Sequence, residues 1–264
     1  TENYNITTQN GTLEVTARTL EITAASASRP YDGTALANMG YSTTAGSLAA
    51  GQTLDSATVT GSQLYPGSSA NTSSGAVIKD TGGTDVTANY AITYVNGTLT
   101  VTPAEIAITV TANSDSKEYD GTPLIKNGGV LTSGTLAAGD SLEVTADGSI
   151  TNVGTAANAV DEVRVMHDGT TDVTENYNIT TQNGTLEVTA RPLEITAASA
   201  SRPYDGTALT NTGYTTTAGS LAAGQTLDSA TVTGSQLYPG SSANTASGAV
   251  IKDTGGTDVT ANYA

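Results

Sequence analysis

The strongest constraint on this chain is an internal duplication. Residues 1–91 return as residues 174–264, and only five of these aligned positions differ. The differing pairs are Thr19/Pro192, Ala37/Thr210, Met39/Thr212, Ser42/Thr215 and Ser73/Ala246. Self-similarity of this kind is the signature of repeat architectures, so the chain is expected to be an array of similar units.

A weaker repeat of about half this length lies inside the duplicated block. "SRPYDGTAL" at Ser28 is matched by "SKEYDGTPL" at Ser116, and "GSLAAGQTL" at Gly46 by "GTLAAGDSL" at Gly134. "DVTANYAITYVNGTLTVTP" at Asp85 is matched by "DVTENYNITTQNGTLEVTA" at Asp172. The sequence therefore predicts two alternating repeat types. The expected segments are 1–17, the terminal strand of a preceding repeat; 18–103, type A; 104–190, type B; and 191–264, type A without its last strand.

Short runs that alternate apolar residues with Thr, bounded by Gly and Asn, are typical of β-strands. "TLEITAAS" places Leu20 and Ile22 on one face, and "EIAITVTA" does the same with Ile106 and Ile108. No long window carries a helical apolar period. The sequence predicts an all-β chain of small Ig-like sandwiches, with β-grasp-like units as the alternative. Asn96-Gly97 is either a tight hairpin turn or a bulge in one long closing strand.

The junctions between repeats are short and stiff. Inward positions have odd numbers at Leu99 and Val101 but even numbers at Ile106 and Ile108. Because strand side chains alternate with a period of two, this change of parity predicts that the chain enters a new core. Pro103 fixes its own φ near −65°, and no Gly/Ser spacer is present. The expected assembly is an elongated rod.

Composition narrows the function classes. The net charge is −16 with only nine Lys and Arg residues, which disfavours nucleic acid as a partner. No segment has the roughly 18 apolar residues of a membrane span. The chain has no Cys and a single His, His167, expected in an exposed turn. Neither a Ser-His-Asp nor a Cys-His arrangement can therefore recur in each repeat, and no enzyme is expected.

Three motifs recur in order: "K/R-x-Y-D-G-T", "G-x-L-A-A-G-x-x-L" and "N-Y-x-I-T-x-x-N-G-T-L-x-V-T". In this combination the chain resembles the YDG/MBG-type repeat modules of bacterial surface proteins. The resemblance covers the whole chain. It implies an extracellular location at the cell surface or cell wall, in a tandem array of an adhesin-like protein. It implies no catalytic residue and no cofactor.

The tyrosine motifs are the main candidate sites. The Tyr-Asp-Gly motif reads as a turn in which Asp bonds nearby backbone, Gly supplies a positive φ and Tyr fills a thin core. A ligand or cation site is the alternative. The tyrosines that follow Asn read as core aromatics, with a sugar-stacking platform as the alternative. These residues are Tyr31, Asp32, Gly33, Tyr119, Asp120, Gly121, Tyr204, Asp205, Gly206, Tyr90, Tyr177 and Tyr263.

Calcium is the only cofactor that the sequence suggests, and it does so weakly. Carboxylates gather around Gly turns and near one junction, but Ca²⁺ needs six to eight oxygen ligands. No cofactor is therefore expected. The weak candidates are Asp80, Asp85, Asp115, Glu118, Asp120, Asp168 and Asp172.

The sequence favours a structural stalk that projects a functional tip from the cell. The alternative is a set of weak glycan- or host-protein-binding modules that gain avidity from repetition. The expected partners are neighbouring repeats. Residues 4–16 are expected either to fray or to complete segment 191–264 of a neighbouring molecule, head to tail.

Overall fold

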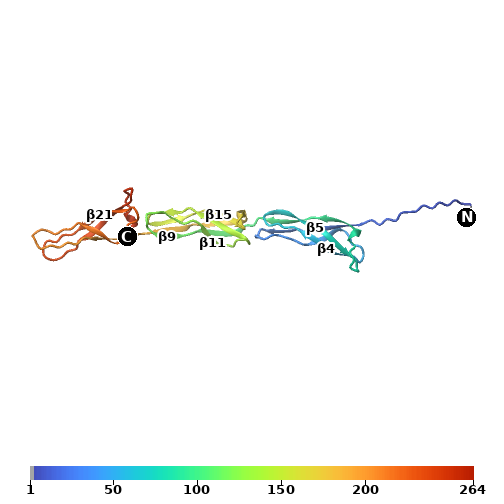
Figure 1. The fold of residues 1–264 in the computed structure, drawn as a ribbon, viewed down its shortest axis with the longest axis horizontal. Coiled ribbons are helices and arrows are strands. Elements are labelled where there is room, and N and C mark those ends of the chain that lie inside the picture. Colours follow the sequence, from blue (N-terminus) through green and yellow to red (C-terminus); the bar gives the residue numbers. More distant parts are fainter. Residues whose placement is uncertain (1–2) are drawn as a thin grey trace. The chain divides into compact units, whose positions relative to one another are not determined.

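A computed structural model describes residues 3–264 and is all-β, as predicted (Figure 1). Thr1 and Glu2 of the predicted terminal strand lie outside the described residues. The only helical segments in residues 3–264 are the three-residue 3-10 turns η1 (Thr87–Asn89), η2 (Thr174–Asn176) and η3 (Thr260–Asn262). The β-grasp alternative thus lacks its helix. No helix within these residues is long and apolar enough to cross a membrane.

The chain forms two compact units. The first contains the chain up to Ile106 together with residues 136–140 and 175–177. The second contains residues 107–135, 141–174 and 178–264. Short pieces of segment 104–190 therefore pack with segment 18–103, and the remainder of it packs with segment 191–264.

Segment 18–103 folds as two sheets. Its strands are β1 (Arg18–Ala24), β2 (Ala27–Pro30), β3 (Tyr41–Gly46), β4 (Thr53–Thr60), β5 (Gly67–Lys79), β6 (Tyr90–Val95) and β7 (Gly97–Thr102). One sheet has the order β3-β1-β6 and the other the order β2-β7-β5-β4, with β4 and β5 side by side (Figure 1). Leu20 and Ile22 of β1 share a core cluster with Ile78 of β5. The alternating apolar residues thus join the two sheets.

Asn96 lies where the chain passes from one sheet to the other. β6 pairs in parallel with β1, whereas β7 pairs with β2 and β5. The predicted hairpin is therefore wrong, because β6 and β7 are not paired with each other. The alternative of one long closing strand interrupted at this point is closer, since only Asn96 separates β6 from β7 and the chain does not reverse, but the two halves belong to different sheets. Gly97 is required for a different reason: a Cβ there would lie 2.4 Å from the carbonyl oxygen of Ala25.

Segment 104–190 has the most strands. They are β8 (Ile106–Ala112), β9 (Asp115–Glu118), β10 (Leu124–Ile125), β11 (Gly129–Ser133), β12 (Asp140–Ala146), β13 (Ser149–Ile150), β14 (Gly154–Asn158), β15 (Val160–His167), β16 (Thr171–Asp172), β17 (Tyr177–Gln182) and β18 (Gly184–Thr189). The sheet orders are β11-β8-β17, β14-β18-β9, β12-β15-β16 and β10-β13. Buried Leu99 and Val101 are followed by buried Ile108 and Val110, which confirms the predicted parity change.

The expectation for His167 is wrong. It ends strand β15 and is only 5% exposed. Its ring nitrogen Nε2 lies 3.5 Å from a carboxylate oxygen of Asp168. Asp168, not His167, occupies the turn, with a positive φ of 47°.

Segment 191–264 keeps only part of the pattern of its twin. Its strands are β19 (Leu193–Ala197), β20 (Tyr214–Gly219), β21 (Thr226–Thr233) and β22 (Thr245–Lys252), in the pairs β19-β20 and β21-β22. Residues 27–30 form β2, but the identical residues 200–203 form no strand. β5 begins at Gly67, whereas β22 begins at Thr245, five residues later in the aligned sequence. The residues that form a strand in segment 18–103 but not in segment 191–264 correspond to those that pair with β7.

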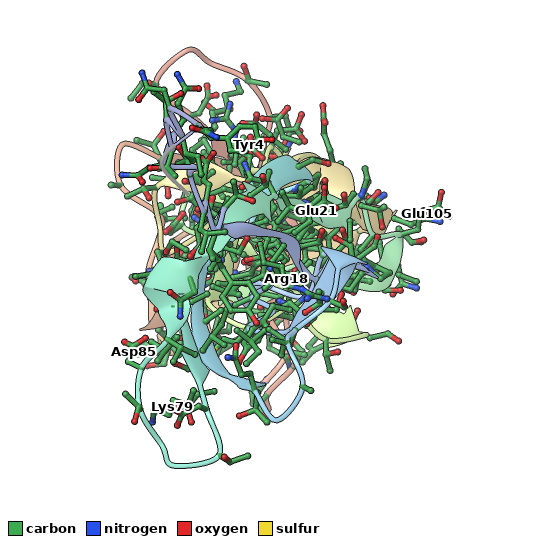
Figure 2. All side chains as sticks on the ribbon, turned by 90° about the vertical axis from the view of Figure 1, so that its right-hand side faces the viewer. Tyr4, Arg18, Glu21, Lys79, Asp85 and Glu105 are labelled. Atoms are coloured by element: carbon green, nitrogen blue, oxygen red, sulfur yellow. The ribbon has the colours of Figure 1, made fainter. Side chains whose placement is uncertain are left out.

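The same dependence on a partner strand appears at the start of the chain. Residues 4–16 are identical to residues 177–189, which form β17 and β18. Within residues 3–17 no strand is present, and Tyr4 is 82% exposed (Figure 2). Leu13 is fully exposed, whereas its counterpart Leu186 is fully buried. One sequence thus has two outcomes, because a strand needs partners for its backbone groups.

Candidate functional site: a repeated tyrosine junction

Each Tyr-Asp-Gly motif forms the same side-chain-supported turn. Asp32 Oδ1 accepts hydrogen bonds from the backbone N–H of Thr34 at 2.9 Å and from its hydroxyl at 2.7 Å. Gly33 has a φ of +78°. The turns at Asp120-Gly121 and Asp205-Gly206 repeat these bonds and positive φ values. The turn holds the preceding tyrosine in a defined direction.

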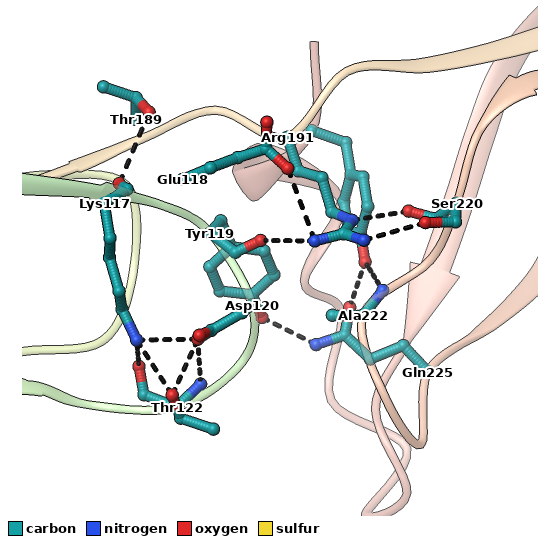
Figure 3. Close-up of polar contacts among 11 residues, drawn as sticks. Lys117, Glu118, Tyr119, Asp120, Thr122, Thr189, Arg191, Ser220, Ala222 and Gln225 are labelled. Atoms are coloured by element: carbon teal, nitrogen blue, oxygen red, sulfur yellow. Dashed lines mark hydrogen bonds and ion pairs between the residues drawn. The ribbon is translucent and has the colours of Figure 1, made fainter.

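The basic residue of the motif braces this turn. Lys117 Nζ lies 2.7 Å from Asp120 Oδ1 and also donates to the carbonyl oxygen and hydroxyl of Thr122 (Figure 3). Arg29 makes the corresponding ion pair with Asp32 at 2.6 Å. The hydrogen bond from Lys117, followed by the bonds from Thr122, lowers the pKa of Asp120 to about 2. The motif thus stabilises its own turn through hydrogen bonds and an ion pair among its own residues.

We define the first tyrosine junction as Tyr31, Asp140 and Tyr177, which all belong to the first compact unit. The Tyr31 hydroxyl donates to Asp140 Oδ1 at 2.8 Å, and the Tyr177 hydroxyl donates to Asp140 Oδ2 at 2.6 Å. The backbone N–H of Ala137 donates to the Tyr177 oxygen at 2.8 Å. Tyr31 is only 2% exposed. One carboxylate therefore connects two tyrosines that are far apart in the sequence.

Gly33 allows the close approach of the backbones at this junction. The backbone N–H of Ala138 donates to the carbonyl oxygen of Asp32 at 3.2 Å. A Cβ on Gly33 would lie 2.0 Å from the carbonyl oxygen of Ala138. Glycine is thus required here for space as well as for its positive φ.

Burial and Asp140 together favour the neutral form of both tyrosines. Burial is the largest cause that raises the pKa of Tyr31, and the hydrogen bond to Asp140 is the next. The pKa of Tyr177 is raised by the same two causes, and the bond from the Ala137 backbone partly opposes the rise. A phenolate beside the Asp140 carboxylate would lose its hydrogen bond and gain repulsion.

We define the second tyrosine junction as Tyr119, Gln225 and Tyr263, in the second compact unit (Figure 3). Gln225 Nε2 donates to the Tyr119 hydroxyl at 2.7 Å, and the Tyr263 hydroxyl donates to Gln225 Oε1 at 2.6 Å. The backbone N–H of Ala222 donates to the Tyr263 oxygen at 2.8 Å. The Tyr119 and Tyr263 rings meet edge to face with centroids 5.7 Å apart. Gln225 thus takes the place that Asp140 has in the first junction.

Arg191, where the chain passes from segment 104–190 to segment 191–264, binds residues on both sides of the second junction. Its Nη1 donates to the carbonyl oxygen of Tyr119 at 3.2 Å and lies 3.4 Å from a carboxylate oxygen of Glu118. Its Nε donates to the carbonyl oxygen of Ser220 at 2.6 Å, and its Nη2 to the Ser220 hydroxyl at 2.8 Å (Figure 3). One guanidinium therefore holds the Tyr-Asp-Gly turn and the facing loop together.

Segment 18–103 contains the part of this arrangement that is formed by the "L-A-A-G" loop and the closing tyrosine, without a Tyr-Asp-Gly tyrosine from the described residues. We define the inner half-site as Ala49, Gln52 and Tyr90. The Tyr90 hydroxyl donates to Gln52 Oε1 at 2.6 Å and accepts from the Ala49 N–H at 2.8 Å. Arg18 binds Ser47 as Arg191 binds Ser220. At the other end of the chain, Tyr204 is 62% exposed.

Sequence reasoning missed the residues at the centre of the junctions, Asp140 and Gln225. The available signal was their position in "L-A-A-G-x-x-L", where Gln52, Asp140 and Gln225 align. It also missed one bridging amide in each repeat, which is buried at Asn71 and Asn158 and partly buried at Asn244. Asn158, fully buried, donates to the carbonyl oxygens of Asn113 at 2.8 Å and Lys126 at 2.7 Å. Asn71 and Asn244 make equivalent pairs of bonds.

The weak calcium candidates serve local turns and ion pairs. Asp80 and Asp172 accept from nearby backbone N–H groups, and Asp85 lies with Lys79 at one loop (Figure 2). Asp115 pairs with Lys126 at 3.2 Å. Asp120, Glu118 and Asp168 have the partners described above. Within residues 3–264 no three acidic or His side chains are grouped in a way that could hold a metal ion.

Comparisons with protein-family models, with curated proteins and with solved structures find no match to this chain.

Proposed function

We propose that this chain is a series of small Ig-like sandwich repeats in the stalk of a bacterial cell-surface, adhesin-like protein. In this role the repeats set the distance between the cell and a functional tip. The observation that carries the proposal is the tyrosine junction. It recurs with one layout although its central residue changes from Asp140 to Gln225.

The junction geometry supports a stiff connection between successive repeats. In each case the Tyr-Asp-Gly tyrosine of one repeat meets the "L-A-A-G" loop and closing tyrosine of the next. Tyrosines whose hydroxyls are hydrogen-bonded in a buried site resist rotation of one repeat against the next. Removing such a tyrosine would leave polar groups without hydrogen-bond partners, at a cost of about 1–3 kcal/mol each. Repetition of such junctions lets the number of repeats set the length of the stalk.

Small-angle X-ray scattering of the 264-residue chain tests this function. With ten-residue strands at about 3.3 Å per residue, each repeat should add roughly 35 Å and the chain should exceed about 100 Å. The curve should be rod-like and unchanged by Ca²⁺ or a chelator. Y31A/Y119A should give a more flexible, shorter particle, whereas Y238A, at a tyrosine that is 69% exposed, should not. A compact wild-type particle would refute the proposal.

A further inference from the structure

Segment 191–264 contains a groove of about 360 Å³. Residues 200–205 and residues 240–244 are two of the stretches that line it, and we call them its first and second walls. In segment 18–103 the identical residues 27–30 and 67–71 flank strand β7. β7 runs parallel to the first wall and antiparallel to the second. The groove therefore lies where the twin repeat holds a strand.

The chain carries a segment with the side chains that such a strand needs. Residues 6–16, "ITTQNGTLEVT", align with residues 92–102, "ITYVNGTLTVT". The two β7 side chains that are fully or almost fully buried, Leu99 and Val101, correspond to Leu13 and Val15. Both Leu13 and Val15 are about fully exposed, at 101% and 99%. The segment has the right inward residues and no sheet of its own.

We propose that residues 6–16 of one copy insert into this groove on a second copy of the chain. The register of β7 fixes the expected pairing. Leu13 should lie opposite Ala200 in the parallel direction and opposite Ser242 in the antiparallel direction, as Leu99 lies opposite Ala27 and Ser69. The inserted strand supplies backbone partners to both walls and buries two apolar side chains.

A second contact reinforces the insertion. In the second junction the chain runs from β18 through Arg191 into the site that receives Tyr119. The inserting copy has the same order, because residues 11–18 are identical to residues 184–191 and lead into its inner half-site of Ala49, Gln52 and Tyr90. The exposed Tyr204 of the receiving copy then enters this half-site. The donor strand of one copy and Tyr204 of the other copy therefore bind at the same time.

This contact is heterologous, since the donor surface and the acceptor surface lie on different parts of the chain. Each added copy presents a new groove and a new donor strand, so assembly continues beyond the dimer, as a filament or until the rotation between copies closes a ring. This self-association does not depend on whether the chain functions as a stalk.

Sedimentation velocity over a concentration series tests the proposal on the 264-residue chain. The wild type should form a ladder of head-to-tail oligomers as concentration rises. L13E/V15E should stay monomeric, and its circular dichroism should be unchanged because both side chains are exposed in the free chain. T12E/T16E adds the same charge at outward positions and should still associate. A wild type that is monomeric throughout, or an L13E/V15E variant that associates equally, would overturn the proposal.

Disulfide trapping tests the register. The chain has no cysteine, so any disulfide reports the introduced pair. The hydroxyls of Ser68 and Thr100 lie 3.0 Å apart, which predicts that Ser241 of the receiver meets Glu14 of the donor. E14C/S241C should give disulfide-linked oligomers on oxidation, whereas E14C/S242C should not, because adjacent strand residues face opposite sides. Equal cross-linking of both pairs would contradict the proposed register.

Discussion

At the scale of single residues, the two junctions solve one problem with different chemistry. Asp140 accepts hydrogen bonds from two hydroxyls, so both tyrosines must stay protonated. Gln225 accepts from Tyr263 and donates to Tyr119. Since the aligned position holds Gln in both type A segments, D140Q is a substitution that the fold already accommodates.

Alkaline titration followed by phenolate absorbance should reveal the carboxylate. The raised pKa values of Tyr31 and Tyr177 mean that their stabilising effect is complete below about pH 10, the ordinary tyrosine value. It is lost as pH rises further toward the folded-state values. D140Q should make both tyrosines ionise at lower pH, and Y31F should remove one late-ionising group. Identical titrations of D140Q and wild type would contradict this account.

Gly33 and Gly206 occupy the same motif and form a matched pair. Their φ values are +78° and +82°, but only Gly33 faces a backbone oxygen within 2.0 Å of the added Cβ, whereas Gly206 has nothing within 4 Å. G206A should lower the free energy of unfolding by about 1 kcal/mol from backbone strain, and G33A by clearly more. Denaturant unfolding of both variants measures the difference. Equal losses would show that the Ala138 contact is unimportant.

Asp120 predicts an acid response. Because its pKa is lowered to about 2, its stabilising effect is present above about pH 4, the ordinary Asp value. The effect is lost as pH falls from about 4 toward 2. D120N should therefore reduce the free energy of unfolding at pH 7 and flatten its dependence on pH below 4. A D120N variant with the wild-type acid profile would contradict the brace described for Lys117.

At the scale of elements, local pattern predicted which residues face the core but not which strands pair. Alternation identified Leu20, Ile22, Ile106 and Ile108 as inward-facing; Leu20, Ile22 and Ile108 are buried, and Ile106 is partly buried. It could not predict the parallel pairings of β1 with β6 and β2 with β7, because these join residues about 70 positions apart. Exposed Leu13 and buried Leu186, in identical surroundings of sequence, make the same point.

The bridging amides Asn71, Asn158 and Asn244 hold neighbouring chain segments together, and hydrophobic periodicity does not reveal them. N158A would remove a fully buried side chain and leave the partly buried carbonyl oxygens of Asn113 and Lys126 without their donor. The expected loss in free energy of unfolding is about 2–4 kcal/mol. S73A is the control, since its hydrogen bonds are long, at 3.2 and 3.3 Å, and the twin segment already has Ala246 there. The midpoint temperature of thermal unfolding should be much lower for N158A than for S73A. Similar midpoints for the two variants would contradict the role of Asn158.

At the scale of the whole molecule, the Tyr-Asp-Gly tyrosine Tyr119 connects segment 104–190 to segment 191–264. Within the second compact unit, Tyr119, Gln225, Tyr263 and Arg191 make this connection. The motif could be found from sequence, because it recurs in all three segments. Its partners could not, since Asp140 and Gln225 lie more than 100 positions from Tyr31 and Tyr119.

The most direct test measures the distance between spin labels on either side of this junction. Nitroxides at V130C and T231C, both exposed positions in the second compact unit, report one repeat each. The account predicts one narrow distance distribution for the wild type, a broad one for Y119A, and a narrow one for the control Y238A. A broad distribution in the wild type, or one that Y119A leaves unchanged, would contradict it.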